Sequence, residues 1–232
     1  MSAKPSATRV DRTASALADL SLAGESGRFL GSEDELLLRF GVSRPTLRQA
    51  AKMVANDRLI TVRRGTGGGV YSDRPDAGEA VRGAARYLRM NGATLHDVFA
   101  VNSMIAEHTA ASAAACPDPA LRAELESFSS RIDRNQSAGE IVRAENELAG
   151  LLARMSGNPA IELVMAIFFR FGMEEHRVRF YGSPGDRDKA RELQHGLCRA
   201  VLSGDPDIAR LMMRRRSTML DEWFAQAEEG GQ

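Results

Sequence analysis

Residues 32–71 read SEDELLLRFGVSRPTLRQAAKMVANDRLITVRRGTGGGVY, and this stretch decides the fold of the chain. Ser32 and Glu35 have the spacing of a capping box, in which each side chain bonds to the backbone N–H of the other residue. This pattern predicts a helix over 33–40. Its inner side is expected to carry Leu36, Leu37 and Phe40. Gly41 then turns the chain.

A second helix follows the turn and carries basic side chains. Ser43 is placed to cap this helix, and Pro45 lies in its first turn, where a missing N–H costs little. Helical spacing predicts an inner side formed by Leu47, Ala51 and Val54. The outer side is then formed by Arg44, Thr46, Arg48 and Lys52. The arrangement is typical of a helix-turn-helix whose second helix enters the major groove of DNA.

A glycine-rich hairpin follows the second helix. Residues 59–64 partly alternate apolar and polar side chains, which predicts a half-buried strand, and Val70 and Tyr71 begin the return strand. We interpret the hairpin as a wing, with Arg63 and Arg64 at its base to follow a DNA backbone or enter a minor groove. A plain flexible hairpin is the alternative. A phosphate-binding loop is disfavoured, because no Lys-Ser/Thr pair follows the glycines.

These motifs resemble the DNA-binding domain of the GntR family over most of residues 12–72, most strongly in the run GVSRPTLR at 41–48. The resemblance implies that DNA is contacted by Ser43, Arg44, Pro45, Thr46, Arg48, Arg63, Arg64, Gly65 and Thr66. The chain departs from the family where Gly31 replaces a usual Pro and Asp34 replaces a usual Arg. Because a carboxylate repels phosphate, we expect the DNA contact normally made at position 34 to be lost.

The composition favours helices and a basic N-terminal part. The 232 residues are 43% hydrophobic but only 6% aromatic, which favours helices over sheets. The chain is neutral overall, yet residues 1–75 hold 12 Lys/Arg and 8 Asp/Glu, against 19 and 23 in the remainder. A basic front fits a nucleic-acid surface. Cys116 and Cys198 lack CxxC spacing, so we expect two buried thiols in a reducing cytoplasm.

We predict a mainly α fold, with an N-terminal winged helix-turn-helix and a C-terminal all-α bundle of about seven helices. Residues 1–10 are expected to be a disordered lead-in. The winged helix is expected over 11–72, with its first helix at 12–23, and the polar segment 73–76 is a linker. The bundle is assigned to 77–228. Its helices are expected over 77–90, 95–115, 119–132, 138–155, 159–180, 186–203 and 206–226.

The predicted bundle resembles the FCD-type effector domain of the FadR subfamily, through LHDVF at 95–99, SGNP at 156–159 and HGLCRAVLSGD at 195–205. Many such domains hold a divalent metal through one Asp and three His, and the corresponding positions here are Glu145, Ala149, His195 and Arg216. Ala149 has no lone pair and Arg216 is a permanent cation, so we predict no metal and no cofactor. A different site completed by His108 or His176 is the alternative.

The missing ligands change the expected effector. An apolar group would fit a pocket lined by Met104, Leu148, Leu152, Met165, Phe168 and Phe169. The alternative is that these residues only form the core of the bundle. Acyl-CoA-binding members of the subfamily dispense with metal. The resemblance therefore implies a fatty-acyl or other hydrophobic acid, paired through its carboxylate or phosphate with Arg216. The alternative for residues 214–216 is a solvated basic face, since only one of the three can easily point inward. Asn102 replaces a pocket Arg of the family. The predicted effector-binding residues are Asn102, Glu145, Ala149, Leu152, His195 and Arg216.

The two resemblances together imply a ligand-responsive transcriptional regulator. A repressor, the family's commoner mode, would bind an inverted-repeat operator as a homodimer, and an effector would release it by changing the distance between the recognition helices. A response to a small carboxylate metabolite, or DNA binding without any effector, are the alternatives. An enzyme, such as a helical metal hydrolase on a nucleic-acid anchor, is disfavoured because the sequence lacks HExxH, GxSxG and a recognisable Cys/His nucleophile motif.

Overall fold

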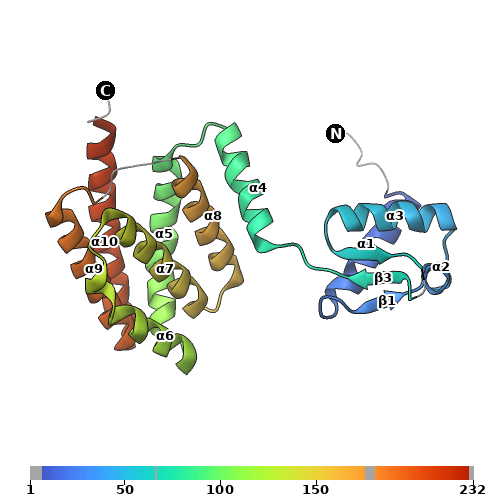
Figure 1. Ribbon diagram of the computed structural model, residues 1–232, viewed down its shortest axis with the longest axis horizontal. Coiled ribbons are helices and arrows are strands. Elements are labelled where there is room, and N and C mark those ends of the chain that lie inside the picture. The colour runs from blue at the N-terminus through green and yellow to red at the C-terminus, as the bar shows by residue number, and fades with distance from the viewer. Residues whose placement is uncertain (1–6, 66, 176–180, 230–232) are drawn as a thin grey trace. The chain divides into compact units, whose positions relative to one another are not determined.

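The computed structural model describes residues 7–65, 67–175 and 181–229, and the chain divides into two compact units, 1–80 and 81–232. The elements of the first unit are α1 (Arg9–Leu22), β1 (Phe29–Gly31), α2 (Glu33–Phe40), α3 (Arg44–Asn56), β2 (Ile60–Arg63) and β3 (Gly69–Ser72). The division lies within α4 (Ala77–Met90). Figure 1 shows a mainly α fold with a small sheet, as the sequence predicts.

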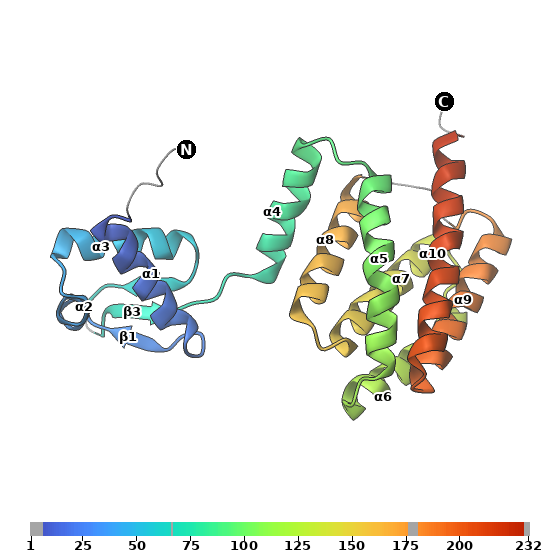
Figure 2. The same ribbon diagram turned by 180° about the vertical axis from the view of Figure 1, so that it is seen from behind.

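The first unit is a winged helix. Its three strands form an antiparallel sheet in the order β1-β3-β2, in which Val62 of β2 faces Val70 of β3 (Figures 1 and 2). The predicted hairpin is thus confirmed. The third strand, β1, was not predicted, and it pairs Phe29 with Tyr71. Only one residue of β2, Ile60, is buried, so this strand is less covered than the alternation suggested.

The apolar faces of the three helices meet over the sheet. Leu36 of α2 and Leu47 and Val54 of α3 are almost completely buried, and Leu17 of α1 joins them. Leu37 and Phe40 are partly buried against the same cluster, which confirms the predicted inner face of α2. Burial of this kind contributes about 1.5–3 kcal/mol per large apolar side chain, so the helix-turn-helix is held by its packing.

Helix α1 begins earlier than predicted. Thr8 and Asp11 form a capping box, in which Asp11 N donates to Thr8 Oγ1 at 3.2 Å and Thr8 N donates to Asp11 Oδ2 at 2.9 Å. Because both groups of the cap are satisfied, the helix starts at Arg9 rather than at residue 12. Residues 9 and 10, assigned to a disordered lead-in from the sequence, are therefore helical, and residues 1–6 lie outside the described range.

Glycines are required at the turn and at the wing. Gly41 ends α2 with φ 61°, a left-handed conformation that favours glycine. Gly69 opens β3 with φ 154°, and a Cβ there would lie 2.4 Å from the Phe29 ring and 2.9 Å from Gly31 O. A larger residue at position 69 would therefore push β1 and β3 apart.

The second unit is all helical. It contains α5 (Leu95–Ala114), α6 (Pro119–Ser129), α7 (Ala138–Met155), α8 (Pro159–Glu175), α9 (Pro184–Leu202) and α10 (Pro206–Glu229), besides the rest of α4. Helix α5 contacts α7, α8, α9 and α10, and both views place it between α8 and α10 (Figures 1 and 2). The seven predicted helices are therefore all found among the described residues.

Several helix ends differ from the prediction, most by one to three residues. Helix α6 stops at Ser129, and a separate turn of 3-10 helix covers Ile132–Arg134. Helix α9 begins at Pro184 because Ser183 and Asp186 form a capping box. The predicted extension of α8 to residue 180 passes through 176–180, which lie outside the described residues.

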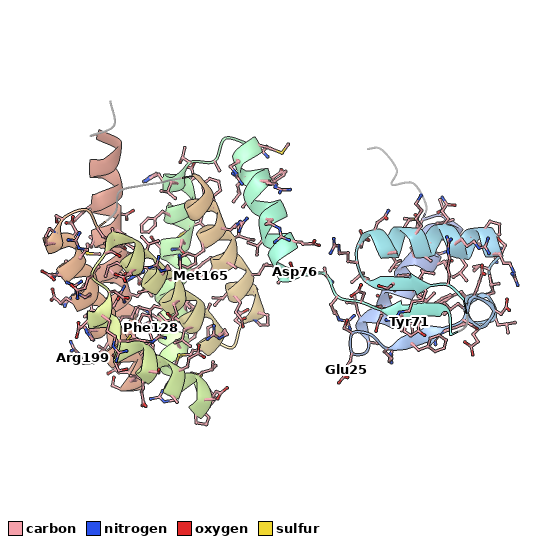
Figure 3. All side chains as sticks on the ribbon, in the orientation of Figure 1. Glu25, Tyr71, Asp76, Phe128, Met165 and Arg199 are labelled. Carbon is pink, nitrogen blue, oxygen red and sulfur yellow. The ribbon has the colours of Figure 1, made fainter. Side chains whose placement is uncertain are left out.

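The core of the helical unit is aliphatic and rich in alanine. Phe128 of α6 and Leu148 and Leu152 of α7 are nearly inaccessible, and Figure 3 labels Phe128 and, on α8, Met165 among the side chains of this unit. Both cysteines are buried and unpaired, as predicted. Burial raises the pKa of the Cys198 thiol to about 12, so this thiol stays protonated near neutral pH.

Arg74, just after β3, fastens the chain back onto α1. Its guanidinium donates to the carbonyls of Ser21 (3.0 Å) and Gly24 and to its own neighbour Asp73 (2.8 Å). The carbonyls at a helix C-terminus lack intrahelical partners, and a basic side chain satisfies them. The predicted linker 73–76 thus includes a residue that belongs structurally to the winged helix.

We expect Arg74→Ala to destabilise the winged-helix unit by about 1–3 kcal/mol, because it leaves several carbonyls at the end of α1 without their donor. Urea unfolding of the full chain, followed by hydrogen exchange resolved to each unit, should show earlier loss of protection in α1 and unchanged protection in α7. Arg74→Lys is the matched control and should recover part of the loss. Equal effects on both units would contradict the assignment.

Candidate nucleic-acid interface and ligand pocket

Helix α3 presents its basic start to solvent. The side chains of Arg44 and Arg48, one helical turn apart, are 60% and 69% exposed. Thr46 is half-buried, and Pro45 lies within the first turn, as predicted. Leu47 and Val54 are buried on the opposite side, so packing fixes which face of the helix is free. The residues predicted from the sequence to contact DNA in this helix therefore share one accessible surface.

Ser43 does not cap α3 in the predicted way. It occupies the N-cap position, but its hydroxyl lies 2.9 Å from the Thr46 hydroxyl, and among the described residues its side chain makes no capping bond to the helix backbone. Ser43 is exposed, and Thr46 is half-buried. The first turn of α3 therefore offers two adjacent hydroxyl groups and uncapped backbone N–H groups, which are suitable partners for a phosphate.

Two acidic residues at the start of α2 pair with the two arginines of α3. Asp34 Oδ1 accepts from Arg44 Nη2 at 2.7 Å. Glu33 accepts from Arg48 through both oxygens, with Nε at 2.8 Å and Nη2 at 3.3 Å. The hydrogen bond from Arg48 lowers the pKa of Glu33. The sequence suggested only that Asp34 would repel phosphate, whereas the structure shows that it binds an arginine.

The wing carries the second group of predicted DNA contacts. Arg63 lies over the Tyr71 ring, 4.2 Å from its centroid, and the Tyr71 hydroxyl donates to Gly67 O at 2.9 Å. These contacts hold the base of the wing. Arg64 and Gly65 are exposed, and Arg64 has no polar partner within the part of the chain that the structure describes. Thr66, also predicted as a contact, lies outside the described residues.

A pocket of about 220 Å³ opens within the helical unit. Helices α5, α7, α8, α9 and α10 all contribute to its lining, which is mainly apolar. The predicted residues Leu148, Leu152, Met165, Phe168 and Phe169 line it. Met104 does not, because its side chain on α5 is 72% exposed. The predicted apolar stripe is therefore partly correct, and the error follows from assigning Met104 to the wrong face of α5.

One wall of the pocket holds a buried ion pair. Glu145 of α7 and Arg216 of α10 form an ion pair whose side chains are only 9% and 12% exposed. Gln194 of α9 donates to Glu145 Oε1 at 2.8 Å. Burial lowers the pKa of Arg216 to about 10, which still leaves the guanidinium charged at neutral pH. The opposite charge of Glu145 compensates this cation in an otherwise apolar surrounding.

Four buried polar atoms have no hydrogen-bond partner among the described residues, namely Asn102 Oδ1, Glu145 Oε2, Gln194 Oε1 and Arg216 Nε, although Glu145 Oε2 takes part in the ion pair. Asn102 and Arg216 both line the pocket, as do Ala149 and Leu152. Buried polar groups without a partner are rare and need an explanation. A ligand with a polar head would supply one.

His195 is not part of the pocket, which corrects the sequence prediction. Its Nε2 lies 2.9 Å from Asp133 Oδ1, at the edge of the helical unit. The neighbouring residue Gln194 faces Glu145 instead, because one residue along a helix turns the side chain by about 100°. Gln194 was not predicted from the sequence, because it is a polar residue that only the structure shows to be completely buried, in the middle of α9.

Arg216 alone of the three consecutive arginines points inward. Arg214 donates to both oxygens of Glu107 at 2.9 and 2.7 Å on the surface, and Arg215 is exposed. This confirms the expectation that one of the three faces the core. The sequence analysis also missed Tyr181, which lines the pocket and is 4% exposed, so that burial raises the pKa of its hydroxyl.

The described residues contain no group of three or more His, Cys, Asp or Glu side chains that could hold a metal. His108 is exposed, and His176 lies outside the described range. Within that range the helices also include none with the length and hydropathy needed to span a bilayer.

Residues 97–216 match the family model of the FCD domain, which is more than half of the chain. Among solved structures, Streptococcus agalactiae GntR is similar at a TM-score of 0.67 and 19% identity, covering 91% of this chain and 98% of its own. E. coli McbR/YncC gives 0.49 and 16%, covering 94% and 98%. No curated protein matches the sequence. The first structure shows a shared fold over both units.

The buried pair gives a stability prediction. Removing one partner leaves a buried charge uncompensated, so Glu145→Leu should lower the free energy of unfolding by about 3–5 kcal/mol. The double variant Glu145→Leu/Arg216→Met should recover most of this loss, because no charge then remains. Urea unfolding measures both. The control is Glu107→Leu, which removes the partner of exposed Arg214 and should have a much smaller effect. A double variant as unstable as the single one would contradict the prediction.

Proposed function

This chain belongs to the GntR family of transcriptional regulators, in the FadR-like branch that carries an FCD domain, and we propose that it is a repressor. It would bind an inverted-repeat operator as a homodimer and be controlled by a small hydrophobic acid. The observation that carries the proposal is the exposed face of α3, on which Arg44 and Arg48 lie one turn apart beside Thr46. Its place of action would be the cytoplasm.

Helix α3 has the properties of a recognition helix. In a helix-turn-helix, the N-terminal residues of the second helix reach base edges in the major groove. Arginine donates two parallel hydrogen bonds to guanine O6 and N7, and a hydroxyl bonds to phosphate. Arg44 and Arg48 supply the first chemistry, and the exposed hydroxyl of Ser43 supplies the second. Arg64 in the wing would add a contact to the backbone or minor groove.

The pocket supports an amphipathic acid as effector. Arg216 is held by Glu145, yet its Nε remains buried without a partner within the described residues. A guanidinium has five N–H donors and can bind a second carboxylate. The rest of the lining includes Leu148, Met165 and Phe168, which offer apolar surface for a short chain or ring. A carboxylate head at Arg216 and an apolar tail along α8 would use both parts.

The size of the pocket favours a small acid over a complete acyl-CoA. Sites for drug-sized ligands enclose about 300–1,000 Å³, whereas this pocket encloses about 220 Å³. A nucleotide-bearing thioester would therefore have to leave most of its atoms outside. The small-carboxylate alternative differs only in how much apolar tail the ligand carries. DNA binding without an effector would leave the unpartnered polar atoms of the pocket unexplained.

An effector can release DNA only if it binds two arrangements of the protein with different affinity. Five helices meet at the pocket, so a ligand there would contact α5, α7, α8 and α10 together. An arrangement in which these helices close around the ligand would bind it more tightly than an open arrangement. The proposed consequence is a changed separation of the two recognition helices of a dimer, which a spaced pair of half-sites would detect.

Arg44→Ala should weaken binding to a selected operator by about 1–3 kcal/mol, which corresponds to about 5- to 150-fold, and abolish its sequence-specific shift. The loss should be largest for the base pair that Arg44 contacts. Operators selected from a randomised duplex pool by the wild-type protein provide the probe, and an electrophoretic shift provides the readout. The control, Arg12→Ala, removes the same charge from α1. Unchanged operator binding by Arg44→Ala would remove the recognition role of α3.

Straight-chain carboxylates of increasing length should raise the melting temperature, because a ligand that binds only the folded state stabilises it. The rise should pass through a maximum at a short or medium chain and be absent for the matched primary alcohols. The double variant Glu145→Leu/Arg216→Met, which leaves no buried charge unpaired, should abolish the rise, whereas Arg214→Met, the surface control, should keep it. If no acid stabilises the wild type, or if the double variant responds like the wild type, the effector assignment is wrong.

A further inference from the structure

We propose that Asp34 and Glu33 are positioning residues that make DNA recognition by α3 selective, by holding Arg44 and Arg48 and cancelling their charge toward phosphate. The inference rests on the proposed DNA-binding role of α3. It goes beyond that role because it assigns a function to a helix, α2, whose acidic start would otherwise be expected to weaken any contact with DNA.

The pairing is specific in its geometry. Glu33 and Asp34 are adjacent at the start of α2, and Arg44 and Arg48 are separated by one turn of α3, so two neighbouring carboxylates meet guanidinium groups from successive turns. The distances are 2.7 Å for Asp34 to Arg44 and 2.8 Å for Glu33 to Arg48. Ser32 fixes the start of α2 through its capping box with Glu35, which places both carboxylates.

Both arginines keep donors that can read a base. Glu33 takes the edge of Arg48 formed by Nε and Nη2, which leaves the edge formed by Nη1 and Nη2. Asp34 takes only one N–H of Arg44, from Nη2. Because a guanidinium carries five N–H donors in a rigid fork, each side chain retains two donors in the geometry that guanine requires. The carboxylates thus orient the guanidinium groups and leave enough N–H donors to bind a base.

The pairing also removes most of the attraction to phosphate. Non-specific binding to DNA comes almost entirely from cations that displace counterions from the backbone. On this part of α2 and α3, two arginines face two carboxylates, so the pairs carry no net charge. Exposed ion pairs contribute little to folding stability. The two ion pairs would instead affect DNA binding. They would weaken non-specific contacts with phosphate and leave the contacts with bases unchanged.

Asp34→Asn tests the proposal, because it frees Arg44 without changing the size of the side chain. At about 0.1 M salt, affinity for a random-sequence duplex should rise about five- to tenfold, and the slope of log affinity against log salt should steepen by about 0.9, as for one added phosphate contact. Preference for the sequence selected by the wild type should fall by a similar factor. Fluorescence anisotropy over a range of potassium chloride concentrations measures all three.

Two matched variants separate geometry from net charge. Asp57→Asn removes the same charge at the other end of α3, where no ion pair to Asp57 occurs among the described residues, and should leave affinity, slope and preference within about twofold of the wild type. Asp34→Glu keeps the charge and should behave like the wild type. Equal effects of Asp34→Asn and Asp57→Asn would overturn the proposal, as would a rise in specific and random binding by the same factor.

The selection step distinguishes failure of this proposal from failure of the proposed function. If the wild type enriches no sequence from the randomised pool, sequence recognition by α3 is wrong, and the positioning role is overturned with it. If the wild type enriches a sequence and Asp34→Asn prefers it as strongly as the wild type does, recognition stands and only the role of Asp34 is overturned. Glu33→Gln should repeat the effects of Asp34→Asn through Arg48.

Discussion

A buried guanidinium is the constraint on which the helical unit depends. Arg216 lies among apolar side chains, where an uncompensated charge would be very unfavourable. Glu145 compensates it, and Gln194 in turn satisfies Glu145. Three helices, α7, α9 and α10, are therefore linked by one polar cluster at the wall of an apolar pocket.

The winged helix uses the same pairing of Arg with an acidic side chain, but at the surface. Arg44 and Arg48 face Asp34 and Glu33 in solvent, where water screens the charges and the pairs add little to stability. A buried ion pair therefore acts mainly on the stability of the fold, whereas an exposed ion pair acts mainly on the binding of another molecule. Under the two proposals, the pair in the pocket would limit which ligand can enter, and the pairs on α3 would limit which DNA can bind.

The sequence predicted the local structure well, because local signals set it. Capping boxes at Ser32 and Ser137 begin α2 and α7 at the expected residues, and Gly41 ends α2. The errors concern contacts between distant segments. Strand β1 depends on Phe29 meeting Tyr71, about forty residues later along the chain. A strand of three residues is too short to show a periodic pattern of apolar and polar side chains, so the sequence does not predict its pairing.

The site predictions show the same division. Ala149, Leu152 and Arg216 line the pocket, and Ala149 and Arg216 had been located by counting from short motifs of the resembled family. His195, taken from the same resemblance, lies against Asp133 instead, because its neighbour Gln194 faces Glu145 and one residue along a helix turns a side chain by about 100°. The ion pair between Asp34 and Arg44 was also not predicted from the sequence. The charge of Asp34 indicates that it repels phosphate, but it does not indicate which side chain lies beside it.

The bonds of the winged helix to the segment that follows it bear on how a ligand could act. Arg74 binds the end of α1, and Arg58, just after α3, pairs with Glu79 at the start of α4 at 3.0 Å. Both contacts lie within the first unit, so the beginning of α4 is bonded to the winged helix. A ligand can shift only an equilibrium between states that it binds unequally. An effector acting along α4, as proposed, would therefore have to favour a state in which these bonds are changed.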